Sequence, residues 1–158
     1  MEVVIRKMQS ADLAGAVRVL SQWNMAPITP SPQIPSPERE SINIGNSVVA
    51  ELGGEIVGVA SYVVHTPDLA ETASHAVDQR YRGQGIGHLL QTARLREMKE
   101  KGIRTVRTET DRRETVEWLI RKFGFTIIGT NRKKHSFSVI GIDYWTVLEL
   151  DLSRCTLS

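Results

Sequence analysis

The sequence predicts a mixed α/β domain built on one β-sheet, with helices packed on its faces. Three observations predict this class. β-rich runs alternate with amphipathic helical patterns along the chain, glycines and prolines separate the segments, and no internal repeat interrupts the order. The 158 residues are 41% hydrophobic and 24% charged, which fits a single domain spanning residues 1–158.

The amino-terminal region predicts a strand and then a helix. Val3–Ile5 form a short β-rich run. Ser10 stands where a helix cap is expected, ahead of an apolar face that contains Leu13, Val17 and Leu20.

A proline-rich segment follows this helix. Five prolines lie between Pro27 and Pro37, which excludes a regular helix or a central strand and predicts a long loop. Loops of this length are mobile surface segments or functional ones, and this one follows the first helix, where it can drape over a cleft. Both interpretations stay open.

Three β-rich runs come next. Ser47–Leu52 and Glu55–His65 are joined at Gly53-Gly54, which predicts a hairpin. The third run, Thr72–Val77, leads directly into a cluster of glycines.

A second helix is predicted after the glycines. Ile86, Leu90 and Ala93 mark one side of it, and Gly102 provides a left-handed end. The segment Ile103–Thr110 is rich in β-branched residues and predicts another strand.

The third predicted helix is introduced by Asp111 and Glu114, which resemble a capping pair. Val116, Ile120 and Phe123 supply its apolar face.

The carboxyl-terminal part predicts two more strands, Phe125–Ile128 and Tyr144–Leu152. A basic stretch, Asn131–His135, connects them. It has no interleaved aromatic residues, so we interpret it as a solvated turn. We also assign the three tryptophans to the core by default.

Composition excludes several classes of protein. The formal net charge is +2, which is too small to favour nucleic-acid binding. No apolar run approaches the roughly 20 residues that cross a bilayer, and the first ten residues lack the apolar stretch of a signal peptide, so we expect a cytoplasmic protein. The single cysteine, Cys155, precludes an internal disulfide, and the four histidines lack the spacing of a metal site, so no metal is expected.

The segment most informative about chemistry is Arg82-Gly83-Gln84-Gly85-Ile86-Gly87, where a strand leads through glycines into a helix. Glycines let the backbone approach a ligand closely, and the first amides of a helix favour an anion such as a pyrophosphate. The dinucleotide fingerprint is excluded because His88 stands where its third glycine belongs. The P-loop is excluded because His88-Leu89 replace its lysine and hydroxyl residue.

This segment resembles the pyrophosphate loop of the GNAT superfamily of acyl-CoA-dependent N-acetyltransferases. The resemblance extends back through Ala76-Val77-Asp78 and forward to Arg121-Lys122-Phe123-Gly124-Phe125, and covers about half of the chain. It implies a mixed, mostly antiparallel sheet with a V-shaped splay between the fourth and fifth strands. Acetyl-CoA, the acetyl donor, would lie in that opening.

The resemblance also implies which residues hold the donor. The pantetheine arm would pair with the backbone of Ala76 and Val77, and the phosphates would meet the loop. Arg113 departs from the family's asparagine at its position, and this cation either meets the phosphates as well or faces solvent. The loop residues are Arg82, Gly83, Gln84, Gly85, Ile86 and Gly87.

Acetyl transfer to an amine needs a base, a polarised carbonyl and a proton for the leaving thiolate. Glu71 and His75, on the strand that leads to the loop, are our candidates for the base; each also has an ordinary reading, as a solvated charge or a packed ring. The family's frequent acid is a tyrosine, but that position here is Ile120, which has no proton to donate.

Our leading functional hypothesis is an N-acetyltransferase that acts on the primary amine of a small metabolite by direct attack in a ternary complex. Two alternatives stay open: an acyl-CoA-binding regulatory module with little catalysis, and a peptide or protein N-acetyltransferase. Exposed edges of a terminal strand are compatible with a homodimer.

Overall fold

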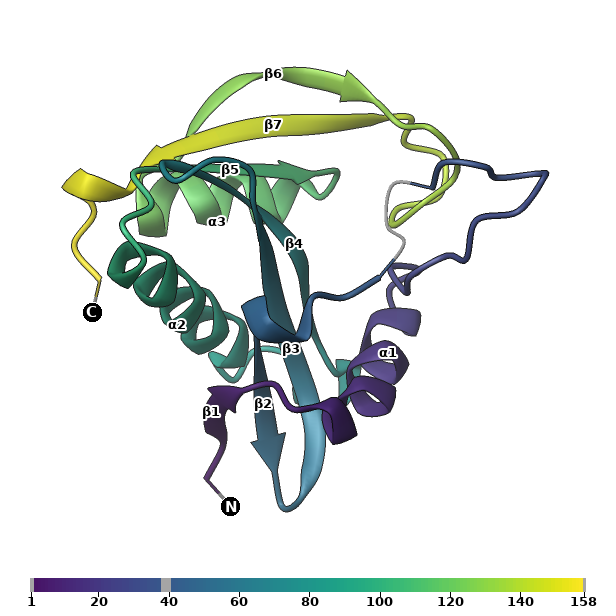
Figure 1. The fold of residues 1–158 in the computed structure, drawn as a ribbon, viewed down its shortest axis with the longest axis horizontal. Coiled ribbons are helices and arrows are strands. Elements are labelled where there is room, and N and C mark those ends of the chain that lie inside the picture. The colour runs from purple at the N-terminus through teal and green to yellow at the C-terminus, as the bar shows by residue number, and fades with distance from the viewer. Residues whose placement is uncertain (1, 38–40, 158) are drawn as a thin grey trace.

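The computed structural model describes residues 2–37 and 41–157. Within these residues, the sheet has seven strands in the order β1-β2-β3-β4-β5-β7-β6, and β4 and β5 form its parallel pair (Figure 1). The other neighbouring strands pair antiparallel. The helices and strands are, in chain order, β1 (Val4–Lys7), α1 (Leu13–Ser21), β2 (Ser47–Leu52), β3 (Glu55–Val64), β4 (Leu69–Val77), α2 (Ile86–Glu100), β5 (Thr105–Thr110), α3 (Arg113–Phe123), β6 (Thr126–Arg132) and β7 (Tyr144–Asp151).

Helices cover both faces of the sheet (Figure 1). On one face, Val19 and Leu20 of α1 pack against Val49 and Val59. On the other face, Leu90 of α2 packs among buried residues of β2 and β3. Gly58 on β3 has no side chain because a Cβ there would lie 2.8 Å from Leu90 Cδ1. This close approach fixes α2 against the strands that precede the glycine cluster.

The predicted hairpin and the proline-rich loop are confirmed. Gly53 and Gly54 join β2 to β3 with φ values of 58° and 83°, which suits glycine. Within the described residues, the chain from 22 to 43 contains no helix or strand, as the prolines predict.

Several element details differ from the prediction. Ser10 does not cap α1; it begins a short 3-10 turn, and the Asp12 carboxylate accepts from Gln9 N–H at 2.8 Å. Asp111 does not cap α3, because its carboxylate bonds to Ser138 and Val139 instead.

The apolar face of α3 is also rotated relative to the prediction. Leu119 and Phe123 are buried in the core, whereas Ile120 is 43% exposed. The sequence pattern counted Ile120 inward because it lies four residues after Val116, but α3 packs through Leu119 against β5 and β7.

The sheet splays between β4 and β5, as the family resemblance implies. Pairing is confined to Leu69 with Thr105, Ala70 with Val106 and Glu71 with Arg107. At the next position, Thr72 Oγ1 and Thr108 Oγ1 share a hydrogen bond of 2.8 Å. Beyond this apex the strands diverge, and the facing edges of both enclose an opening.

Candidate functional site

The glycine segment forms a loop that ends at the first residue of α2. Gly83 and Gly85 have φ values of 77° and 82°, and a Cβ at either position would meet nothing within 4 Å. The first helical bond runs from Leu89 N–H to Gly85 O at 3.1 Å, so the amides of residues 86–88 have no partner inside the helix. The open cradle and the converging amides fit a phosphate group.

An ion-pair cluster lies at the end of β4, just before this loop. The Asp78 carboxylate, which is fully buried, accepts from Arg80 Nη2 at 3.0 Å and from Arg18 Nη1 at 3.0 Å. The Arg80 guanidinium holds the pKa of Asp78 well below its ordinary range, against the opposing effect of burial. Asp78 also accepts from the amide of Arg80 and caps the 3-10 turn Gln79–Tyr81.

Along β4, the backbone N–H and C=O groups point alternately towards β3 and into the opening. Asp78 N–H bonds to Val57 O of β3 at 2.8 Å, so the main-chain groups of Val77 point the other way, into the opening. Val77 O accepts from Trp23 Nε1 at 2.9 Å. Ala76 is paired with Val59 of β3 and is buried in the core cluster that contains α1, and it also lines the opening. Its predicted contact with the pantetheine arm stays a prediction.

A cavity of about 180 Å³ fills the opening. β4 and β5 form its walls, Thr115 and Trp118 of α3 close one side, and Trp23 and Met25 close the end beyond α1. All three tryptophans of the chain line it. Each is half-buried, and Trp23 and Trp118 also pack against core clusters, as we expected, whereas Trp145 is in none of them.

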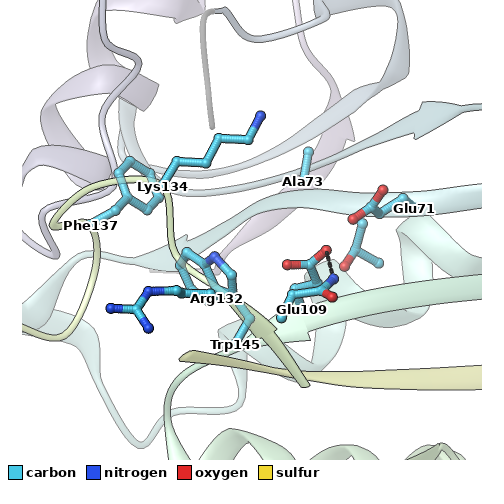
Figure 2. Close-up of a pocket in the computed structure, with 9 residues that line it drawn as sticks. Glu71, Ala73, Glu109, Arg132, Lys134, Phe137 and Trp145 are labelled. Atoms are coloured by element: carbon cyan, nitrogen blue, oxygen red, sulfur yellow. Dashed lines mark hydrogen bonds between the residues drawn. The ribbon is translucent and has the colours of Figure 1, made fainter. Parts of the chain in front are cut away.

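A second cavity of about 380 Å³ lies next to the first, between β4, β5 and the β6–β7 connection (Figure 2). The two cavities share four lining residues: Thr72, Ala73, Glu109 and Trp145. They therefore meet at the apex of the splay. A donor and an acceptor entering from opposite sides would come into contact there.

Two carboxylates line the larger cavity, one from each diverging strand (Figure 2). Glu71 Oε1 lies 2.8 Å from His65 Nε2. Glu109 Oε1 accepts from Asn131 Nδ2 at 3.3 Å. Glu109 also lines the smaller cavity, which places it at the junction. The sequence analysis did not select Glu109, although its position at the end of a strand beside the predicted opening was a usable signal.

His75 lies at the smaller cavity, but its surroundings disfavour a role as a base. Its Nε2 lies 3.0 Å from Gly87 O, and its ring stacks on Trp118 with centroids 5.7 Å apart. Burial, with the Arg94 charge, lowers the pKa of His75 to about 3, although the bond to Gly87 opposes this shift. A neutral imidazole that binds the first turn of α2 stabilises the loop and accepts a proton poorly.

No tyrosine takes the place of the family's acid in the cavities that we describe. Tyr62 is buried, and its hydroxyl donates to Glu97 at 2.7 Å. Burial raises the pKa of Tyr62, and the Glu97 carboxylate raises it further. Tyr144 lies beside Arg132 on the exposed outer strands. Neither residue lines the cavity at the apex.

The basic stretch before the last strand is solvated only in part: Arg132 and Lys134 are exposed, but Lys133 is not. Lys133 Nζ lies 2.7 Å from Asp111 Oδ2, and these side chains are 3% and 2% exposed. Lys133 also donates to Phe137 O at 2.7 Å and lies over the Trp145 ring. The pair ties the β6–β7 connection to the end of β5.

A second contact ties the same connection to the loop after α1, which lies beside it (Figure 1). Ser138 N–H donates to Asn24 O at 2.9 Å, and Asn24 Nδ2 donates to Ser138 O at 3.4 Å. Both residues have positive φ values, 56° for Asn24 and 60° for Ser138. Such strained backbones persist where surrounding contacts hold them, and they are enriched at functional sites.

The predicted phosphate contact Arg113 points away from the site. Its side chain is 91% exposed and pairs with Glu117 at 3.4 Å. The preceding residue, Arg112, lines the smaller cavity.

Within the described part of the chain, no group of three or more His, Cys, Asp or Glu side chains is arranged to hold a metal ion. Over the same residues, no helix combines the length and apolar character needed to span a bilayer.

Comparison with known proteins identifies a family. A family model described as Acetyltransferase (GNAT) family matches residues 16–125. No curated protein matches at a significant level.

Among solved structures, Ard1 from Thermoplasma volcanium is similar over 100% of both chains, with 20% identity and a TM-score of 0.73. The ribosomal-protein-S18-alanine N-acetyltransferase from Escherichia coli covers 96% of this chain and 94% of its own, with 19% identity and a TM-score of 0.73. Rv2747 from Mycobacterium tuberculosis, solved in complex with CoA, covers 94% and 98%, with 21% identity and a TM-score of 0.67. At these identities the likeness shows a shared fold.

Proposed function

This chain belongs to the GNAT acetyltransferase family, and from that premise we propose that it transfers the acetyl group of acetyl-CoA to the primary amine of a small molecule. The observation that carries the proposal is the meeting of the two cavities at Thr72, Ala73, Glu109 and Trp145. The smaller cavity is lined by His75, whose ring nitrogen contacts Gly87 O of the glycine loop, and by Trp23, over which Arg82 of that loop lies. The larger cavity carries carboxylates suited to an amine. This geometry supports direct transfer in a ternary complex, since a donor and an acceptor could approach the apex from different sides.

The chain's own residues suit the binding of the donor. The amides at the start of α2 would hold its diphosphate, with Arg82, Gly83, Gln84, Gly85, Ile86 and Gly87 forming the cradle. The inward-facing main chain of Val77 would pair with the pantetheine arm. When bound, acetyl-CoA supplies an activated acyl group as a thioester.

The carboxylates suit the binding and deprotonation of the acceptor. An ammonium group near Glu71 and Glu109 is stabilised by their charge, and a carboxylate at the junction accepts the proton that the amine must lose before attack. We assign this base to Glu109, because it lines both cavities, and assign Glu71 to holding the acceptor. Water protonates the departing thiolate, whose pKa of about 8.5 makes it a good leaving group.

The primary experiment incubates the purified protein with acetyl-CoA and a panel of small amines, while free thiol is followed. We expect turnover with at least one amine and a product acetylated on nitrogen. Calorimetry with CoA is run in parallel. No binding of CoA would contradict the proposal as a whole.

One observation favours a second function. Ile120 replaces the family's tyrosine and lies on the exposed side of α3, so a dedicated acid is missing at that position. An acyl-CoA-binding regulatory module would bind CoA tightly, and none of the amines tested would cause the release of free thiol. Peptides added to the panel test the third alternative, a peptide or protein acceptor, as named for the ribosomal-protein-S18-alanine N-acetyltransferase from Escherichia coli.

The homodimer stays a prediction, which analytical ultracentrifugation tests.

A further inference from the structure

The indole of Trp23 gathers two arginines from opposite sides of the splayed opening. The guanidinium carbon of Arg82, in the glycine loop, lies 5.3 Å from the centre of the indole ring. The guanidinium carbon of Arg112, at the end of β5, lies 4.8 Å from the same centre. Trp23 itself is fixed to β4 by the bond from Nε1 to Val77 O. A single side chain thus bridges the mouth of the opening and holds a cation from each side.

These two arginines differ from the neighbouring arginines in their ion pairs. Arg18 and Arg80 form ion pairs with Asp78 and Glu55. Arg113 pairs with Glu117. Among the residues described in the structure, no carboxylate forms an ion pair with Arg82 or Arg112. Packing on an aromatic face orients a guanidinium but leaves its N–H donors for another acceptor.

We propose that Arg112, held beside Arg82 by Trp23, binds a phosphate group of the acyl-CoA donor from the β5 side of the opening. The inference rests on the proposed function, because it takes the donor to be a coenzyme A thioester. It adds a contact that the glycine loop does not provide: the loop lies at the end of β4, whereas Arg112 lies across the mouth and lines the cavity. A guanidinium binds phosphate oxygens through two parallel N–H donors.

Coenzyme A carries phosphate in two places, the diphosphate and the 3′-phosphate of the ribose. Both are anionic, and both suit a guanidinium. The chemistry that Arg112 recognises is therefore the phosphate group itself. Ligands that lack one of these phosphates separate the two sources.

The test measures CoA affinity by calorimetry for the wild-type protein and for Arg112→Gln. The matched control is Arg113→Gln, which removes the same charge from the adjacent residue, where the side chain is exposed and paired on the helix surface. We expect Arg112→Gln to weaken CoA binding about 10-fold or more, as for the loss of a charge-assisted bond, and Arg113→Gln to leave it unchanged. Raising the salt concentration should narrow the difference between wild type and Arg112→Gln.

Dephospho-CoA, which lacks the 3′-phosphate, then locates the contact. If Arg112→Gln weakens the binding of dephospho-CoA as much as the binding of CoA, Arg112 contacts the diphosphate. If the substitution leaves the affinity for dephospho-CoA unchanged, Arg112 contacts the 3′-phosphate. Either result supports the proposal. A Trp23→Leu variant should reproduce the loss, since it removes the surface that orients Arg112, with thermal denaturation confirming that each variant is folded.

Other results would overturn the proposal while sparing the proposed function. Wild-type binding of CoA combined with unchanged affinity in Arg112→Gln excludes the contact. So does an equal loss in the Arg113→Gln control, because a general change of field at this end of the molecule then explains it. Failure of the wild-type protein to bind CoA at all contradicts the proposed function itself.

Discussion

Gly85 begins α2 with a backbone conformation that L-residues adopt at a cost, and its missing side chain faces open space. We predict that Gly85→Asp abolishes CoA binding, because it puts a carboxylate where the diphosphate would lie. The matched control is Gly102→Asp, at φ 87° beyond the other end of α2, where a Cβ also meets nothing. Both substitutions should cost about 1 kcal/mol of unfolding free energy. Equal CoA binding by the two variants would contradict the placement of the diphosphate.

The carboxylates at the apex give a second prediction. Glu109→Gln should lower kcat about 100-fold, as for loss of a general base, while CoA affinity is unchanged. Glu71→Gln should mainly raise the KM of the amine, because Glu71 lines the larger cavity, where we place the acceptor, and does not line the smaller one. Steady-state kinetics with the best amine of the panel test both. A larger loss of kcat in Glu71→Gln would return the base to Glu71, where the sequence analysis placed it.

The buried imidazole of His75 predicts a dependence of stability on pH. Its pKa is about 3 in the folded protein and 6.5 in its ordinary state. Between these values the unfolded chain binds a proton that the folded protein excludes, so stability falls as the pH decreases from 6.5 towards 3, by at most about 1.4 kcal/mol per pH unit. Above pH 6.5 this contribution is constant. Urea denaturation from pH 4 to 8 measures it, and His75→Gln should show a flatter profile.

The glycine loop before α2 was predictable from the sequence, whereas the junction of the two cavities was not. Closely spaced glycines before a helix have one dominant structural meaning, so Gly83, Gly85 and Gly87 were identifiable. Glu109 and Trp145 were not identifiable. They lie at the site only because β5 diverges from β4 and because β7 pairs with β5, and both are long-range features of the sheet. Trp23 packs against the core as expected, but nothing local in the sequence shows that it also forms an aromatic wall of a cavity.

The connection between β6 and β7 depends on the buried pair Lys133–Asp111. Removing one partner by Lys133→Met or Asp111→Leu should cost about 3–5 kcal/mol of unfolding free energy, because a buried charge is left uncompensated. The double variant Asp111→Leu/Lys133→Met should lose less than the sum of the two single changes. A double-mutant cycle by chemical denaturation measures the coupling. The exposed pair Arg113–Glu117 is the reference and should couple by no more than about 0.5 kcal/mol. Additive effects at Lys133 and Asp111 would contradict the buried pairing.

The order of the helices and strands was predictable, but their ends and faces were less so. The hairpin at Gly53-Gly54 and the strand Ser47–Leu52 follow from turn chemistry and β-branched residues, which are local signals. The strand before the glycine loop begins at Leu69 and not at Thr72, since its first residues are defined by pairing with β5. Long-range pairing also decides that Lys133 is buried, which a run of basic letters does not reveal.

The buried core of the molecule falls into three clusters. α1 packs with β2, β3 and β4, and the start of α2 packs with β2 and β3. The third cluster joins the end of α2, α3, β5 and β7 to Tyr62 of β3 and Ala70 of β4, so it spans the two diverging strands. A ligand that contacts both diverging strands should therefore stabilise the fold as a unit. We predict that CoA at about 100 times its Kd raises the unfolding free energy by about 2.7 kcal/mol, which differential scanning calorimetry detects as a higher Tm. Dependence of this shift on CoA concentration is the control, and an unchanged Tm would contradict binding to the folded protein.

The short parallel ladder between Leu69–Glu71 and Thr105–Arg107 has an evolutionary consequence. It separates the half of the chain that would recruit the donor from the hairpin that would choose the acceptor. Mutations in residues 131–145 can therefore accumulate without disturbing the phosphate cradle, provided that Lys133 keeps its buried anchor. A scaffold divided in this way can acquire new amines by changing one hairpin while its coenzyme stays the same.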